Sequence, residues 1–224
     1  MNRLAFLLVV FSLSASVNAN AQEQNALHAP DKEDFSDVKP APTLWVNFGG
    51  SFSDLTSHDN NANSSIRSAI TGGIEAEIPV SRHFSIQTGI DYVQKGASID
   101  AFDGFTGGKL VINYFELPVM ARFNLQAGVN YFSFFAGPYL AIAVSRSEED
   151  NNGETFDGTR AIKQWDTGIR LGAAFAMPIT NFLTASINLQ NDFGVLDINS
   201  NSTNHDDAVR NTNFVVTAAL GVRF

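Results

Sequence analysis

Four histidines are the residues in this sequence best suited to acid–base chemistry: His28, His58, His83 and His205. His58 and His205 are each followed by an aspartate, and general acid–base catalysis uses an imidazole beside a carboxylate. Neighbours in the sequence do not by themselves form a catalytic pair, because the geometry of the side chains defines the pair. We therefore interpret both as solvated loop residues, with a catalytic role as the alternative.

The acidic run E-E-D-N-N-G that starts at Glu148 partly matches a calcium-binding loop. Glu148, Asp150 and Asn152 occupy the first, third and fifth positions of such a loop, and Gly153 occupies the sixth. The twelfth position, which needs a bidentate glutamate, is Thr159. The match fails at its strongest ligand, so we predict a solvated acidic loop from 146 to 159. Weak contact with a divalent ion, or contact that bridges to lipopolysaccharide, is the alternative.

A third group of reactive side chains consists of charges of both signs within segments that otherwise alternate between apolar and polar residues. Its members are Glu75, Glu77, Asp91, Lys95, Glu116, Arg122, Arg170 and Arg223. Because unpaired buried charges are costly, we predict that these side chains pair with one another or with trapped water. For Glu116 we favour a pair with Arg or Lys over a catalytic role.

The segments that position these charges have the two-residue period of β-strands. There are about eight, each near the length of about ten residues that a tilted membrane-spanning strand needs. They cover residues 44–52, 69–80, 84–95, 111–123, 131–144, 165–177, 183–192 and 211–224. In the last one, every second residue back from Phe224 is apolar as far as Phe214.

Short connections follow the second, fourth and sixth segments, and longer polar ones follow the first, third, fifth and seventh. This alternation is typical of outer-membrane barrels, which have short periplasmic turns and long extracellular loops. We predict an all-β fold, a transmembrane antiparallel up-and-down β-barrel of about eight strands, whose charges point into a narrow, side-chain-filled lumen. A soluble β-barrel or sandwich with the apolar face inside is the alternative.

The remaining sequence is consistent with export. Residues 1–21 are interpreted as a signal peptide, with Arg3, an apolar core and the cleavage pattern A-N-A at its end. Residues 22–42 are acidic and proline-containing and are predicted to be a disordered periplasmic leader, followed by the barrel at 43–224. No later stretch has the ~18 consecutive apolar residues that a membrane helix needs. A net charge of -9 argues against nucleic acid as a partner, and the absence of cysteine excludes a disulfide and a Cys-based metal site.

Several of the strand-like segments contain recognisable motifs. The segment Y-F-E-L-P-V from Tyr114, followed by F-A-G-P-Y from Phe135, resembles the Y-x-E-I-P and G-P-Y pattern of the PorT-like family of outer-membrane β-barrel proteins. F-S-I-Q-T-G-I-D-Y-V-Q-K-G from Phe84 resembles a second family strand, and W-D-T-G from Trp165 with a following L-G resembles a third. The resemblance covers nearly all of the chain from about position 44.

The charged lumen and the long acidic loops lead us to expect a non-enzymatic protein of the cell outer membrane, structural or docking a protein partner through its extracellular loops. The resemblance implies, in addition, a link to protein secretion. Outer-membrane lipid, lipopolysaccharide and the barrel-assembly machinery are the other expected partners, the last through the C-terminal strand with Phe224 as its assembly signal. No cofactor is expected. The alternatives are a channel for ions or small solutes and a rim enzyme acting on lipid, for which His58 and His205 are the candidate residues.

Prolines and glycines in the motifs point to structural roles. Pro118 and Pro138 cannot donate ladder hydrogen bonds, so we predict bulges or strand bends at both. Glycines at 89, 137, 168 and 172 are predicted to leave room in a crowded lumen.

Overall fold

The structure is a computed structural model that describes residues 41–57, 64–99, 108–150, 155–157, 163–198 and 209–224. The predicted signal peptide, at 1–21, lies outside the described residues. So does the predicted leader, at 22–42, except for its last two residues. The first strand begins at Thr43, where the predicted barrel begins.

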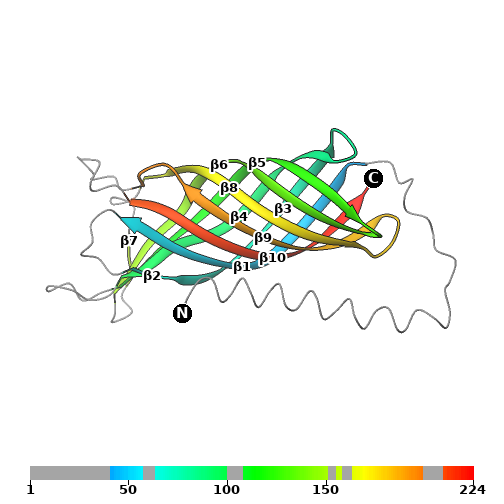
Figure 1. The fold of residues 1–224 in the computed structure, drawn as a ribbon. Helices are drawn as coiled ribbons and strands as arrows, with labels where there is room; N and C mark the ends of the chain where they lie inside the picture. Colours follow the sequence, from blue (N-terminus) through cyan, green and yellow to red (C-terminus); the bar gives the residue numbers. More distant parts are fainter. Residues whose placement is uncertain (1–40, 58–63, 100–107, 151–154, 158–162, 199–208) are drawn as a thin grey trace. The chain divides into compact units, whose positions relative to one another are not determined.

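Eight long strands form one closed antiparallel barrel, as predicted (Figure 1). They are β1 (Thr43–Ser57), β3 (Arg67–Pro79), β4 (Phe84–Ile99), β5 (Gly108–Ala127), β6 (Asn130–Asp150), β8 (Trp165–Pro178), β9 (Leu183–Gly194) and β10 (Val209–Arg223). Each pairs with the next along the chain, and β10 pairs with β1 to close the barrel. Two short strands add to the sheet: β2 (Ser64–Ser65) pairs with β4, and β7 (Thr155–Asp157) pairs with β6. The described residues include no helix long and apolar enough to cross a membrane.

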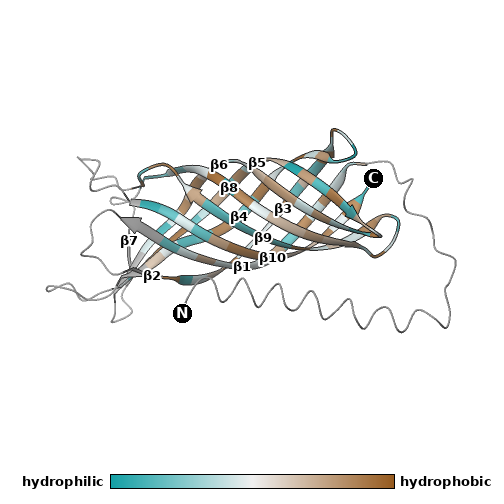
Figure 2. Ribbon diagram, in the orientation of Figure 1, coloured by the Kyte–Doolittle hydropathy of each residue, from teal (hydrophilic) through white to brown (hydrophobic). Residues whose placement is uncertain are grey.

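Most large apolar residues of the strands face outward, and most polar ones face the lumen, where a smaller number of apolar side chains is also buried. Figure 2 shows the resulting alternation of brown and teal along the ribbons. Outward side chains such as Phe48, Ile74 and Ile187 are 65 %, 56 % and 57 % exposed, whereas the inward Ser51 and Asn213 are fully buried. This exposure suits a protein whose outer face contacts lipid.

Aromatic side chains pack in pairs on the outer face at two heights along the barrel. Phe84 and Phe123 pack at a ring distance of 4.9 Å near the β3–β4 turn, and Phe132 and Phe175 pack at 5.0 Å at the same end. Tyr92 packs on an outward phenylalanine at 5.8 Å, farther along β4. Rings at these positions are typical of the girdles that border the apolar band of membrane barrels.

We call the two ends of the barrel the turn end and the loop end. At the turn end, short connections join β3 to β4, β5 to β6 and β8 to β9. The β5–β6 turn is shorter than the predicted 124–130, because β5 runs to Ala127 and only Gly128 and Val129 lie between the strands. Gly128 has φ 65°, a left-handed conformation that glycine adopts at little cost.

At the loop end, β1 and three neighbouring strands, β4, β5 and β6, are longer than predicted: β1 continues to Ser57 and pairs there with Val209. β4 continues to Ile99, β5 begins at Gly108, and β6 continues to Asp150, so the predicted loops at 96–108 and 146–159 are partly strand. The inner face of these extensions stays buried, since Ala97, Leu110 and Ile112 are at most 7 % exposed. Their outer face no longer needs apolar residues once the sheet projects beyond the lipid.

The prolines interrupt the ladder without adding a residue, so of the two predicted outcomes, a bulge or a strand bend, the bulge is wrong and the bend stays a prediction. β5 and β6 pair at Pro118–Tyr139 and again at Ala121–Ala136 in the same register. A proline removes one donor, whereas a bulge needs an extra residue in one strand. The register of the β5–β6 pair shifts at another place, between Asn113 and Tyr114 of β5.

β4 crosses the mouth of the lumen toward β1 at the loop end. Its ladder with β3 runs up to Thr71–Val93. Beyond that point its backbone carbonyls accept hydrogen bonds from β1 side chains: Ser51 Oγ donates to Gln94 at 3.0 Å, and Ser53 Oγ donates to Gly96 at 2.9 Å. The mouth is therefore narrowed by backbone as well as by side chains.

Candidate functional site

The inner face of the barrel gathers seven ionisable side chains into one buried group, which we call the lumen cluster. Its members come from β3, β4, β5, β8 and β9 and are Glu75, Asp91, Lys95, Glu116, Asp166, Arg170 and Asp192. All seven are buried. They meet because each occupies an inward position of its strand, and the closed barrel brings these positions to one level.

Arg170 is the centre of the lumen cluster. Its Nε lies 2.7 Å from Asp192 Oδ1, its Nη1 lies 2.6 Å from Asp91 Oδ2, and its Nη2 lies 2.6 Å from Glu116 Oε2. Glu75 Oε1 is farther away, at 3.9 Å from Nη1. A guanidinium has five donors in a fixed fork, so this one side chain connects strands on several sides of the lumen.

Lys95 occupies a cage of carboxylates and tyrosines. Its Nζ lies 2.6 Å from Glu116 Oε1, 3.4 Å from Asp166 Oδ2 and 3.3 Å from the hydroxyl of Tyr139. The ammonium is also 4.4 Å from the ring centre of Tyr139 and 5.4 Å from that of Tyr114, within cation–π range. The sequence motifs that begin at 84, 114, 135 and 165 therefore each contribute a side chain to this one cage.

The structure distributes the eight predicted charged residues over three places. Five belong to the lumen cluster: Glu75, Asp91, Lys95, Glu116 and Arg170. Glu77 and Arg122 form a separate pair toward the turn end, with Arg122 Nε 3.8 Å from Glu77 Oε1. Arg122 Nη1 also donates to Gln87 at 2.8 Å, which connects this pair to the cluster through the 2.6 Å Gln87–Glu75 hydrogen bond. Arg223 ends β10 and is only half-buried.

Asp166 and Asp192 were not among the predicted charged residues, although both belong to the lumen cluster. Each lies near the loop end of its strand, where a polar residue also suits the start of a loop. The sequence did contain a signal for them, because residues separated by an even number of positions face the same side of a strand. Asp166 shares the inward face with Arg170, and Asp192 shares it with Thr184 and Ser186.

An apolar layer, which we call the apolar cap, covers the lumen cluster on its loop-end side. It consists of Leu110, Ile112, Tyr114, Tyr139, Ala141, Ala143 and Ile198. Ile198 comes from the segment after β9, is completely buried, and accepts a 2.8 Å hydrogen bond at its carbonyl from the Lys163 amide. On the turn-end side, Met120, Phe135 and Ala174 form a second buried apolar group. The charges are therefore enclosed from both directions.

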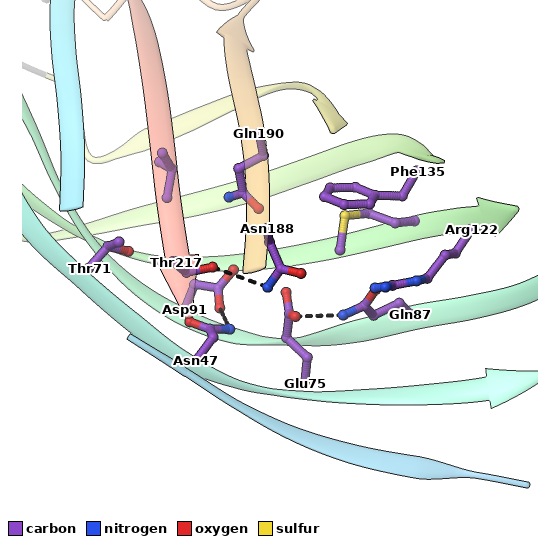
Figure 3. A pocket seen from close by; sticks show the side chains of 12 residues that line it. Asn47, Thr71, Glu75, Gln87, Asp91, Arg122, Phe135, Asn188, Gln190 and Thr217 are labelled. Atoms are coloured by element: carbon purple, nitrogen blue, oxygen red, sulfur yellow. Dashed lines mark hydrogen bonds between the residues drawn. The ribbon is translucent and has the colours of Figure 1, made fainter. Parts of the chain in front are cut away.

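The lumen contains a small polar cavity between the lumen cluster and the Arg122 side chain (Figure 3). Its lining includes Asn47, Glu75, Asp91 and Arg122, and Figure 3 shows the 3.1 Å hydrogen bond from Asn188 Nδ2 to a threonine of β10. Its volume of about 10 Å³ is enough for roughly one water molecule. The interior is thus filled by side chains, as expected for a barrel of about eight strands.

Two of the predicted glycines make room for rings inside the lumen. A Cβ at Gly168 would lie 2.6 Å from the hydroxyl oxygen of Tyr139, and one at Gly172 would collide with the ring of Phe135. Gly89 and Gly137 instead face the backbone of a neighbouring strand at close range. A methyl group at any of these positions would displace a strand or one of the rings that enclose the charges.

The residues predicted for catalysis or metal binding do not form a site in the described part of the chain. His83 is exposed at the β3–β4 turn, beside Phe123, whereas His28, His58 and His205 lie outside the described residues. The calcium-like segment continues beyond Asp150 into residues that are also outside them. Among the described residues, no three His, Asp or Glu side chains are arranged to hold a metal ion.

A closed antiparallel barrel with an apolar exterior and a polar, side-chain-filled interior is the architecture of proteins that span the bacterial outer membrane with β-strands. The family model described as "Outer membrane protein beta-barrel domain" matches residues 42–213. The chain belongs to this family, which resides in the outer membrane.

Solved structures similar to this chain include three outer-membrane proteins. The chain is 11 % identical to Neisserial surface protein A, covering 81 % of this chain and 97 % of that one, with a TM-score of 0.48. OprG from Pseudomonas aeruginosa is 10 % identical over 82 % and 96 %, with a TM-score of 0.49. A major outer membrane protein from Thermus thermophilus is 12 % identical over 83 % and 100 %, with a TM-score of 0.49. No curated protein matches the chain.

Proposed function

We propose that this protein is a non-enzymatic outer-membrane barrel that docks a protein partner at its loop end and does not conduct solutes. The observation that carries the proposal is the closed lumen, in which Arg170 and its carboxylate partners block the centre and the apolar cap covers them. A barrel with a filled interior offers its rim and loops for recognition, whereas a channel needs a continuous path.

At the loop end, β4, β5 and β6 form a sheet that projects beyond the start of β8. β6 pairs with β8 only as far as Ile142–Trp165 but continues to Asp150, and β5 and β4 accompany it to Gly108 and Ile99. At ~3.3 Å per residue, a projection of about eight residues corresponds to roughly 26 Å of strand. The resemblance to PorT-like proteins is the basis for proposing that the partner belongs to a protein-secretion apparatus. Lipid, lipopolysaccharide and the barrel-assembly machinery are proposed as the further partners.

Shortening the loop-end connections should remove partner binding and leave the barrel folded. Residues 100–107 and 151–154 would each be replaced by a two-residue Asn-Gly turn, which closes antiparallel strand pairs. Chemical cross-linking in native outer membranes, followed by mass spectrometry, should detect a partner for the unaltered protein and lose it in this variant.

The matched control is a two-residue insertion between Gly128 and Val129 at the turn end, which should keep the cross-linked partner. Both variants should show the heat-dependent gel mobility of a folded barrel. An unchanged cross-linking pattern after loop-end shortening would contradict docking at this end.

A further inference from the structure

The lumen cluster has more negative than positive charge. Lys95 and Arg170 contribute two positive charges, and Glu75, Asp91, Glu116, Asp166 and Asp192 contribute five negative ones, which leaves a formal charge of −3 when all are ionised. The Arg122–Glu77 pair is neutral and does not change this balance.

This excess charge lies where water cannot screen it well. Lys95, Glu116, Asp166, Arg170 and Asp192 are each 0 % exposed. Buried charge without compensation is strongly unfavourable, so the excess has to be neutralised by protons or by bound cations.

Two buried oxygen atoms of the pair Asp166 and Asn211 have no hydrogen-bond donor among the described residues: Oδ1 of Asp166 and Oδ1 of Asn211. Glu116 Oε1 also lacks a hydrogen bond there, but it has a cation at 2.6 Å, the Lys95 Nζ. The two side chains are in contact, because Asn211 Nδ2 donates to the other carboxylate oxygen of Asp166 at 2.9 Å. Asn211 is 1 % exposed and also donates to the hydroxyl of Tyr114 at 3.4 Å. Such unpaired acceptors cost free energy unless they have a ligand.

We propose that Asp166 and Asn211 form a binding site for one small monovalent cation of the Na⁺ type. Carboxylate, amide and hydroxyl oxygens are hard ligands, which small hard cations prefer. A site for a divalent ion is disfavoured, since no three acidic or histidine side chains converge in the described residues. Protonation would satisfy Asp166 alone, because an amide oxygen does not take up a proton at ordinary pH. A cation bound by both side chains would compensate both oxygens and lower the excess charge.

The test is the urea-induced unfolding of the full-length protein in detergent micelles at constant ionic strength, with NaCl progressively replacing choline chloride. Choline is too large for the buried site. For one site that exists only in the folded state, the unfolding equilibrium constant should fall about tenfold for each tenfold rise in Na⁺ above the dissociation constant. Asp166→Asn should abolish this dependence, and the control Asp197→Asn, which alters the partly exposed pair with Lys163, should keep it.

The ²³Na NMR linewidth of the unaltered protein provides a second measurement if Asp166→Asn does not fold. Addition of folded protein should broaden the Na⁺ signal more than addition of the same protein unfolded in urea. The proposal is overturned if Na⁺ and choline give the same unfolding curve, if Asp166→Asn retains the full Na⁺ dependence, or if stability follows pH but not Na⁺. The last result would assign the compensating charge to protons.

Discussion

Arg170 is the residue on which the interior depends most. It is buried, and it is within 2.7 Å of carboxylate oxygens from three other strands. Arg170→Met keeps much of the volume but leaves Asp91, Glu116 and Asp192 without this cation, and removing one partner from a buried ion pair costs about 3–5 kcal/mol.

We therefore expect Arg170→Met to lower the free energy of unfolding by roughly 3–5 kcal/mol in urea titrations of the refolded protein. Lys163→Met is the matched control, since Lys163 is 47 % exposed in its pair with Asp197, and exposed pairs contribute about 0–1 kcal/mol. Equal stability of Arg170→Met and the control would show that the cluster contributes nothing to folding.

The charged site was predictable only in part from individual residues. Mid-strand charges such as Glu116 and Arg170 stand out because a membrane-spanning strand has few reasons to contain them. Asp166 and Asp192 do not stand out, since aspartate near a strand end also suits a loop. Which acid meets which base depends on strand tilt and stagger, and residue spacing along one strand does not specify them.

At the scale of the elements, alternation located all eight long strands, but it did not locate their ends. Between the aromatic levels one face contacts lipid, so the pattern is strict. Beyond them the outer face no longer contacts lipid, and β4, β5 and β6 continue through sequence with many polar residues and glycines, which resembles a loop. The prolines are a second example of structure that alternation does not specify. Pro118 has no backbone N–H to donate, but this alone does not reveal whether the strand pairing shifts register or only skips one pair.

The β5–β6 turn gives a test of element geometry. Gly128 has φ 65°, and a Cβ added there would meet no atom within 4 Å, so conformation alone determines the effect of substitution. Gly128→Ala should destabilise the barrel by about 1 kcal/mol, because a residue with a Cβ adopts this region at a cost of roughly that size. Gly128→Asn should cost less, since asparagine enters the left-handed region more readily. Urea unfolding of both variants measures the difference, and equal losses would contradict the turn geometry.

At the scale of the whole molecule, the filled interior is the reason for proposing that this barrel is not a channel. Barrel closure was predictable from the number and alternation of the strands. The apolar cap was not, because Ile198 lies in a segment without periodicity and is buried only by folding back over the mouth. The apolar cap and the lumen cluster together fill the loop-end half of the lumen, and this is the basis for proposing a docking barrel.

Planar-bilayer conductance of the purified, refolded protein tests the closed lumen most directly. The unaltered protein, shown to be folded by its heat-dependent gel mobility, should give no current above that of the bilayer alone in ~1 M salt, where screened surface charge no longer influences ion entry. Stable, stepwise currents from the unaltered protein would contradict the account, because they would require a continuous aqueous path past Arg170 and the apolar cap.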